Sequence, residues 1–171
     1  MAAVPSRFLI AKEKISVSKK DHLLEIGCGN GTLIHEISKE LSSGIIVGID
    51  KSESAIEKAT VKNKASIVDK KVILLNAELQ HAKFSKEQFS KVVSFNVNVF
   101  LRNSELEFRM LKEILKPNGE IFVFYQFPFQ IDIKAAKPIV ENLVRNGFKV
   151  THKELLPASP AAIVYVKAIF G

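Results

Sequence analysis

The stretch 23–33, LLEIGCGNGTL, decides the fold of this chain. Residues suited to a β-strand lead into a turn with glycine at every second position, Gly27, Gly29 and Gly31, and a helical pattern follows. Glycine lets the backbone adopt positive φ and lets a ligand approach without a Cβ in the way. We expect the amides of this turn, and those of the first helical turn, to point outward as unpaired donors. The turn then forms a binding site from backbone groups alone.

A second run, IIVGID at residues 45–50, completes the unit and ends in Asp50. A carboxylate at the end of a second strand can accept hydrogen bonds from both hydroxyls of a ribose. Residues 23–50 therefore predict a strand, a glycine turn, a helix, a strand and an acid, which is one βαβ unit that binds a nucleoside. In the alternative interpretation, Asp50 opens the next helix as its N-cap, with Ser52 close behind.

The spacing of the glycines separates two kinds of cofactor. The dinucleotide fingerprint G-x-G-x-x-G/A fits Gly27 and Gly29, but its third position falls on Thr32. The pattern that starts at Glu25 is E-x-G-x-G-x-G, which resembles motif I of the class I S-adenosylmethionine-dependent methyltransferases. In that family the turn wraps the methionine end of the cofactor. Thr32 disfavours the other class, a nicotinamide oxidoreductase.

Size and composition fit one globular domain. The chain has 171 residues, 47% of them hydrophobic and 25% charged, which excludes a disordered protein. No apolar run approaches the ~20 residues of a membrane span, and residues 1–10 lack the apolar core of a signal peptide. A single cysteine suits a reducing compartment. We expect a cytoplasmic protein that does not associate with membranes.

The formal net charge is +7, and the cations are concentrated in two segments. Residues 1–20 hold five Lys or Arg against one acid, and residues 58–71 hold five Lys against one acid. Such patches can contact phosphates. Both lack the interleaved aromatic residues expected of a surface that stacks on bases, so a solvated basic face is the competing interpretation.

Strand and helix patterns alternate along the chain. A helix pattern opens at residues 104–107, SELE, which has the spacing of a capping box, and its apolar positions continue to Leu115. The last two strands are joined by the short segment 157–160, which implies an antiparallel hairpin. The sequence therefore predicts an α/β fold, a doubly wound, mostly parallel sheet with an antiparallel edge strand. Strands are expected at residues 23–26, 45–50, 72–75, 91–95, 121–125, 149–155 and 162–169, and helices after the glycine turn, at 53–64, from 104 and at 133–145.

The resemblance to class I methyltransferases covers roughly residues 20–170 and implies seven strands, the last inserted antiparallel, with helices on both faces. It divides the chain into an N-terminal segment, 1–20, and the methyltransferase domain, 21–171. At the methionine end of the cofactor it implies that Gly27, Cys28 and Gly29 lie under the carboxypropyl chain and that Glu25 lies near the amino group. Cys28, inside the turn, is alternatively a small packing residue.

At the nucleoside end the resemblance implies that Asp50 binds the ribose hydroxyls and Lys51 lies beside the adenine. Asn76 then accepts from the adenine amino group, the amide of Ala77 donates to the ring, and Asn96 approaches cofactor or substrate. Alternatively, Asn76 only opens a turn and Asn96 only caps a loop.

The sequence assigns no catalytic residue. Methyl transfer from a sulfonium is an in-line displacement, so positioning can supply much of the rate, and a base is needed only for a protonated nucleophile. Residues 96–99, NVNV, lack the paired prolines typical of enzymes that methylate amino groups of nucleic acids. His81 and Tyr125 lie near strand ends, where a solvated loop histidine and a core tyrosine are the alternatives. No cluster has the spacing of metal ligands, so we expect metal independence.

We therefore expect a methyltransferase that transfers a methyl group in-line from S-adenosylmethionine to a small molecule and releases S-adenosylhomocysteine. The alternatives are an RNA or protein methyltransferase that uses the basic patches, or a cofactor-binding subunit without catalysis. Only about 20 residues precede the predicted core and the segment 126–132 is short, so we expect a shallow pocket. Its cover is either residues 8–14, with Phe8, Leu9 and Ile10 as a lid, or a second subunit in a homodimer.

Overall fold

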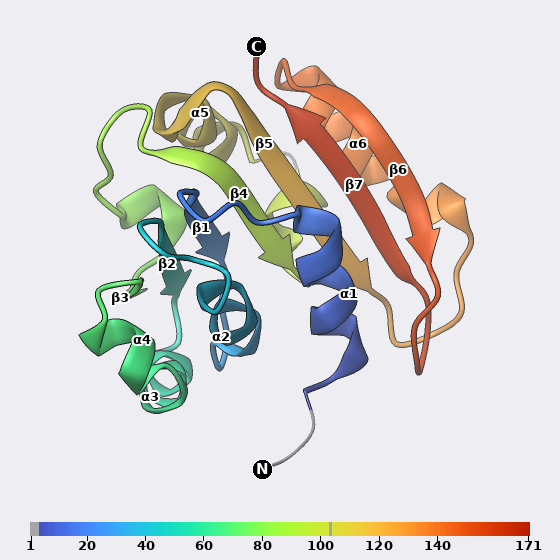
Figure 1. Ribbon diagram of the computed structural model, residues 1–171. Helices are drawn as coiled ribbons and strands as arrows, with labels where there is room; N and C mark the ends of the chain where they lie inside the picture. Colours follow the sequence, from blue (N-terminus) through green and yellow to red (C-terminus); the bar gives the residue numbers. More distant parts are fainter. Residues whose placement is uncertain (1–3, 103) are drawn as a thin grey trace.

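The structure, a computed structural model, describes residues 4–102 and 104–171. Seven strands form one sheet in the order β3-β2-β1-β4-β5-β7-β6 (Figure 1), which confirms the predicted architecture. Strands β3, β2, β1, β4 and β5 run parallel to one another, whereas β7 runs antiparallel to both β5 and β6. The strands are β1 (His22–Ile26), β2 (Ile45–Asp50), β3 (Val72–Asn76), β4 (Phe89–Phe95), β5 (Leu115–Gln126), β6 (Lys149–Leu156) and β7 (Ile163–Ile169).

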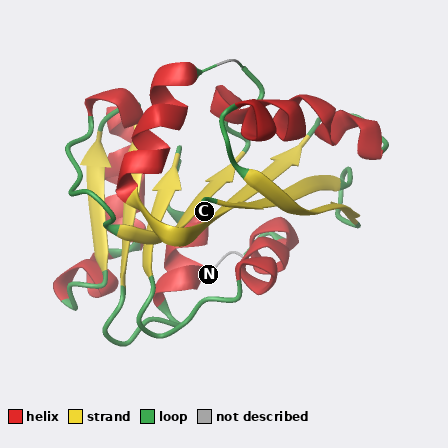
Figure 2. Ribbon diagram, turned by 90° about the horizontal axis from the view of Figure 1, so that it is seen from above, coloured by secondary structure: helices red, strands yellow, loops and turns green. Residues whose placement is uncertain are grey.

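Helices cover both faces of the sheet (Figure 2). Helices α1 and α2 contribute side chains to the hydrophobic cluster on one face, and α5 and α6 contribute to the cluster on the other. The helices are α1 (Ser6–Ile15), α2 (Thr32–Ser38), α3 (Glu53–Lys62), α4 (Lys64–Val68), α5 (Glu105–Ile114) and α6 (Lys137–Arg145), with short 3-10 turns η1 (Leu79–His81), η2 (Asn98–Phe100) and η3 (Ile133–Ala136).

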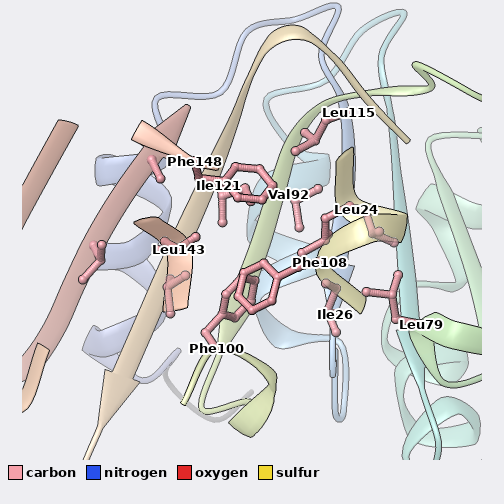
Figure 3. Close-up of a cluster of buried hydrophobic side chains, with 14 of the residues drawn as sticks. Leu24, Ile26, Leu79, Val92, Phe100, Phe108, Leu115, Ile121, Leu143 and Phe148 are labelled. Atoms are coloured by element: carbon pink, nitrogen blue, oxygen red, sulfur yellow. The ribbon is translucent and has the colours of Figure 1, made fainter. Parts of the chain in front are cut away.

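The central strands are apolar on both faces because a parallel sheet is covered on both sides. Along β1, Leu23 packs with α1 and α2, and Leu24 packs with α5 and α6. The second of these clusters is built around aromatic residues (Figure 3), with the rings of Phe100 and Phe108 edge to face at 5.7 Å between centroids. Because β1, β2 and β4 run parallel to one another, their carboxyl ends lie at one edge of the sheet.

The expected antiparallel edge strand is wrong in its position. Strand β7 lies between β5 and β6, so β6 forms the edge. The inserted last strand that the family resemblance implies is confirmed. The short connection fixes only that β6 and β7 pair; their place beside β5 follows from β7 being apolar on both faces, because Ile163, Val164, Tyr165 and Val166 are all buried.

Two local expectations also differ from the structure. Ser104 is the N-cap of α5, but its side chain makes no capping hydrogen bond. The helix ends at Ile114, and Leu115, whose spacing fits the helical pattern, is the first residue of β5 and lies opposite Phe89. The chain turns within this segment at Asn118, which has a φ of 59°. Burial against β4 outweighs helical periodicity at this boundary.

At the amino-terminal edge of the sheet, a cluster of Ser16, Asp21, Ser90 and Lys91 joins α1, β1 and β4. The ammonium of Lys91 donates to Asp21 Oδ2 at 2.7 Å and to the carbonyl of Ser16 at 2.8 Å. The hydroxyl of Ser90 donates to Asp21 Oδ1 at 3.0 Å. Burial alone raises the pKa of Asp21, but the hydrogen bonds from Lys91, Ser18 and Ser90 and the charge of Lys91 outweigh it and lower that pKa.

We expect Lys91→Met to lower the free energy of unfolding by about 2–3 kcal/mol at neutral pH, because it leaves the Asp21 carboxylate buried without its cation. Since the folded-state pKa of Asp21 is depressed, its contribution is present above the ordinary pKa of about 3.9 and disappears as the pH falls through the folded-state value. The difference between the two proteins should therefore shrink in acid.

Urea titrations at several pH values measure this difference. The matched control is Lys86→Met, because the side chain of Lys86 is 81% exposed and lies 3.9 Å from its partner Glu87; it should change stability by less than about 0.5 kcal/mol. Equal losses in the two variants would contradict the role given to the Asp21 cluster.

Candidate functional site

A cavity of about 420 Å³ opens at the carboxyl ends of β1, β2, β3 and β4. This is where an open α/β sheet places its ligand, at the point where strand order reverses. Here the reversal lies between β1 and β4. The residues that line the cavity come from the ends of these strands and from α5: Ile26, Gly27, Ile49, Asp50, Lys51, Ala77, Glu78, Leu79, Gln80, Asn96, Val97, Asn98, Val99, Arg102 and Glu107.

The amides of the glycine turn are engaged inside the protein. Those of Gly27 and Cys28 both donate to the carbonyl of Ile49, at 2.8 and 3.0 Å, and that of Gly31 donates to the carbonyl of Cys28 at 2.9 Å. The expectation of outward, unpaired donors at these residues is therefore wrong. The sequence shows the turn but not the end of β2, whose carbonyl satisfies it. A turn without free amides at these positions gives no cradle for a pyrophosphate.

The Asp50 carboxylate ties the glycine turn to the start of α3. Oδ2 accepts from the amide of Gly29 at 2.9 Å, and Oδ1 accepts from the amide of Ser52 at 2.9 Å. Ser52 is the N-cap of α3, since its side chain accepts from the amide of Ala55, so the interpretation of Asp50 as the N-cap is wrong. Each carboxylate oxygen has a second lone pair, and Asp50 lines the cavity.

The third glycine brings α2 and α3 together. Gly31 has a φ of 70°, and a Cβ on it would lie 2.6 Å from Asn63 Nδ2 and 2.8 Å from Ala59 Cβ. Asn63 also donates to the carbonyl of Gly31 at 3.1 Å. By contrast, a Cβ on Gly29 would meet nothing within 4 Å. Gly31 is therefore required by packing, whereas Gly29, with a φ of 52°, leaves open space above the turn.

Glu25 lies beneath the turn and is only 2% exposed. Burial, and then the negative charge of Asp50, raise the pKa of its carboxyl well above the usual value, although a hydrogen bond from the amide of Ile34 opposes the shift. Oε2 has no hydrogen-bond partner among the described residues. Glu25 is not among the described residues that line the cavity, although the next two residues, Ile26 and Gly27, are.

Cys28 is buried and points away from the ligand side of the turn, toward β2. Its Sγ lies 3.1 Å from where a Cβ on Gly48 would be. Burial, followed by the charges of Glu25 and Asp50, raises the pKa of its thiol, so the reactive thiolate is disfavoured. Cys28 is a small packing residue here, and its sulfur is no nucleophile.

At the end of β3 the structure engages two groups that the resemblance assigns to the adenine. Asn76 Nδ2 donates to the carbonyl of Asp50 at 3.0 Å, which leaves its carbonyl oxygen as an acceptor. The amide of Ala77 donates to the same carbonyl at 3.0 Å and is therefore not free to donate to an adenine ring. Ala77 and Lys51 line the cavity, whereas Asn76 is not among the described lining residues.

At the end of β4, Asn96 lines the cavity in a left-handed conformation with a φ of 58°. Its Oδ1 accepts from the amide of Gln126 at 2.7 Å, so the side chain links the ends of β4 and β5. Asn98 accepts from the hydroxyl of Tyr125 at 3.0 Å. The two asparagines shape the loop as the capping alternative expected, and they also face the cavity.

The sequence did not point to several lining residues. Glu78 and Gln80 follow β3, and Val97 and Val99 follow β4, so their position after a strand was an available signal. Arg102 and Glu107 reach the cavity from the segment leading into α5 and from its first turn, and no local pattern marks them. His81 lies in η1 but is not among the described lining residues, which removes support for it as a base.

The N-terminal segment forms α1, which packs against α2. Ala11 and Ile15 are buried in the core, and the ring of Phe8 lies 5.3 Å from that of Phe95 at the end of β4. The amino end of α1 lies at the same edge of the sheet as the arrowheads of β4 and β5 (Figure 1), although α1 supplies none of the described lining residues.

Between residues 4 and 171, leaving out residue 103, no group of three or more His, Cys, Asp or Glu is placed to hold a metal ion. Within the same residues, the helices are too short or too polar for one to cross a bilayer.

Comparisons with known proteins agree with this geometry. A family model described as "Methyltransferase domain" matches residues 17–149. The putative methyltransferase YrhH of Bacillus subtilis is 25% identical over 111 residues, which are 65% of this chain and 61% of that protein. The demethylmenaquinone methyltransferase of Lactobacillus johnsonii is 27% identical over 113 residues, 64% of this chain and 45% of that protein. This chain thus spans less than two thirds of the length of either relative.

A solved structure extends the similarity to the whole fold. The structure of a SAM-dependent methyltransferase from Aquifex aeolicus superimposes with a TM-score of 0.76 at 15% identity, covering 99% of this chain and 100% of that one. The family match takes in the glycine turn, Asp50 and the β4 end, which together form the cavity. The chain therefore belongs to the methyltransferase-domain family and shares the fold of a SAM-dependent methyltransferase.

Proposed function

We propose that this chain binds S-adenosylmethionine in the cavity and transfers its methyl group in-line to an apolar small molecule. The observation that carries the proposal is the junction of the glycine turn with Asp50, where the amide of Gly29 is held at 2.9 Å by a carboxylate that faces the cavity. A turn without spare donors at Gly27 and Cys28 suits an uncharged alkyl chain and a sulfonium better than a pyrophosphate.

The site residues then take distinct roles along the cofactor. Asp50 accepts from the ribose hydroxyls through its remaining lone pairs, and Lys51 lies beside the adenine. Asn76 accepts from the adenine amino group with its free carbonyl oxygen, and Asn96 lies near the methyl group. Glu25 lies under the turn that carries Gly27, Cys28 and Gly29, where its carboxylate attracts the ammonium of the methionine moiety through the field of the site.

An aromatic strip of Tyr125, Phe127 and Phe129 supports an apolar acceptor. Their rings follow one another from the end of β5, with centroids 4.6 and 5.6 Å apart, and Phe129 is 61% exposed. The hydroxyl of Tyr125 bonds to Asn98, which lines the cavity, so the strip starts where the cofactor site ends. Exposed aromatic rings favour a flat or apolar ligand. The relative from Lactobacillus johnsonii is named a demethylmenaquinone methyltransferase. A demethylmenaquinone is therefore the first acceptor to test.

The same proposal includes a cytoplasmic location, metal-independent transfer, and a lid formed by α1. In-line displacement requires only that the nucleophile and the sulfonium be held in a near-attack geometry. In this lid, Leu9 is 43% exposed, so its side chain is available to contact an acceptor.

The competing activities are methylation of RNA or protein through the basic segments, and cofactor binding without catalysis. Binding to RNA that falls steeply with salt would favour the first.

The Asp50 role predicts a graded loss of cofactor affinity. By calorimetric titration with S-adenosylhomocysteine, Asp50→Ala should weaken binding at least about 30-fold, because hydrogen bonds to a charged group contribute roughly 1.5–3 kcal/mol. Asp50→Asn, which keeps an acceptor, should lose less. The matched control is Asp69→Ala, an exposed acid at the far end of β3, and it should bind as the parent does. Unchanged affinity in Asp50→Ala would overturn the site, provided that circular dichroism shows a folded protein.

Glu25→Gln should raise stability and lower affinity. Because the folded-state pKa of Glu25 is raised, the native protein loses stability as the pH rises from the ordinary value of about 4.3 to that raised pKa. The neutral amide avoids this loss, so the melting temperature of the variant should exceed that of the parent at about pH 9 and match it at about pH 4. Affinity for S-adenosylhomocysteine should fall about tenfold, because the amide carries no charge to attract the ammonium. Glu57→Gln, at an exposed position of α3, is the control. Unchanged affinity would exclude Glu25 from the cofactor site.

The proposed acceptor surface predicts that two variants change the KM for the acceptor but not the affinity for the cofactor product. Phe129→Ser and Leu9→Ser should each raise the KM for an accepted apolar substrate about tenfold, since each removes apolar contact worth about 1–2 kcal/mol. Neither should change the dissociation constant of S-adenosylhomocysteine. Val144→Ser, at an exposed valine of α6, is the control. A rise in KM confined to Phe129→Ser would contradict the proposed lid. An unchanged KM in both variants would contradict the proposed acceptor surface.

A further inference from the structure

Strand β3 leaves one edge of the sheet open, at the left of Figure 1. It pairs only with β2, and its five residues, VILLN, contain no charge and no proline. Natural edge strands are usually protected against pairing by lysine, proline or a bulge. None of these devices interrupts β3, so the edge is built to accept another strand.

The hydrogen bonds of β3 with β2 show which backbone groups face outward. The carbonyl of Lys71 accepts from the amide of Ile46 at 2.9 Å, and the amide of Ala77 donates to the carbonyl of Asp50 at 3.0 Å. Because peptide groups alternate in direction along a strand, the odd-numbered residues face β2. The amides and carbonyls of Val72, Leu74 and Asn76 therefore face the open edge.

The side chains beside this edge are apolar on one face of the sheet. Ile73 is 44% exposed and Leu75 is 36% exposed, and both border a hollow whose other wall includes Phe84. The crossover from β3 to β4 holds only the short turn η1 and no helix over this face. A parallel crossover usually supplies a helix there, so Ile73 and Leu75 stay uncovered within the described chain.

We propose that a second copy of this chain pairs with β3 in antiparallel register about a two-fold axis at Leu74. This register sets Val72 opposite Asn76 and Leu74 opposite itself, which are the residues with outward amides and carbonyls. Ile73 then lies opposite Leu75 in the close, non-hydrogen-bonded pairs. Every outward backbone group of the strand finds a partner, and the contact closes as a dimer because it is self-complementary.

Charges beyond the strand agree with this direction. The antiparallel direction brings the amino end of β3, which Lys70 and Lys71 precede, beside the carboxyl end of the partner strand, which Glu78 follows, so opposite charges meet at both ends of the pair. Lys70 has a φ of 58° and lies in the turn before the strand, outside the paired residues. Parallel pairing would set Lys70 and Lys71 beside their own copies. Glu78 also lines the cofactor cavity, so the partner subunit's Lys70 arrives at the rim of that cavity. The dimer does not depend on methyl transfer, and its test does not use the cofactor.

Sedimentation equilibrium of the full chain, from about 1 to about 200 µM, tests the proposal. The parent should shift from monomer to dimer across this range. Ile73→Lys with Leu75→Lys should raise the dissociation constant at least about tenfold, because it places charges in the cross-strand pairs. Both positions are exposed in the monomer, so the fold should survive. The control, Val144→Lys, introduces the same side chain on an exposed position of α6 and should dimerise as the parent does.

A charge exchange tests the antiparallel direction itself. Lys70→Glu and Glu78→Lys should each weaken the dimer several-fold, and the double variant should recover the parent's dissociation constant within about twofold, since both pairs are restored in the opposite sense. A parent that stays monomeric throughout would overturn the proposal. So would a dimer that Ile73→Lys with Leu75→Lys leaves intact. A double variant that dimerises no more tightly than either single variant would overturn the antiparallel pairing.

Discussion

Asp50 alone holds three segments of the site in place. Its carboxylate accepts the amides of Gly29 and Ser52, and its own carbonyl accepts the amide of Ala77 and the side chain of Asn76. The glycine turn, the start of α3 and the end of β3 are therefore fixed relative to one another before any ligand binds. Such preorganisation lowers the cost of binding, because the loops do not have to be ordered by the cofactor. Asp50, which we propose as the ribose acid, is thus also the structural centre of the site.

The sequence predicted what depends on periodicity and on chain connection. The short apolar runs of β1 and β2, the Gly31 turn between strand and helix, and the final hairpin all appear in the structure. It did not predict what depends on the location of distant groups. The carbonyl of Ile49 satisfies the turn amides, β7 enters the sheet beside β5, and α5 brings Glu107 to the cavity. These relations arise from tertiary packing, which leaves no periodic trace in the local sequence.

The site has an acidic side and an aromatic side. On one side lie the Asp50 carboxylate and buried Glu25, whose pKa is raised by burial and by the charge of Asp50, so that ionisation of Glu25 costs stability unless a cation accompanies it. On the other side, Phe127 and Phe129 present rings without charge. A sulfonium held between the two would face an apolar acceptor with little water present, and a low local dielectric strengthens the field of the carboxylates. The uncovered edge at β3 lies at the opposite side of the cavity from β5 and its aromatic strip, so pairing there leaves the proposed acceptor side open.

The most direct test of the central claim is a crystal structure of the chain with S-adenosylhomocysteine. The account predicts that both ribose hydroxyls lie within about 3.2 Å of the Asp50 carboxylate, with the thioether above the Gly29 turn and the sulfur facing Asn96. A nucleoside bound elsewhere, or a ribose that Asp50 does not contact, would contradict the account and leave Asp50 with its structural role alone.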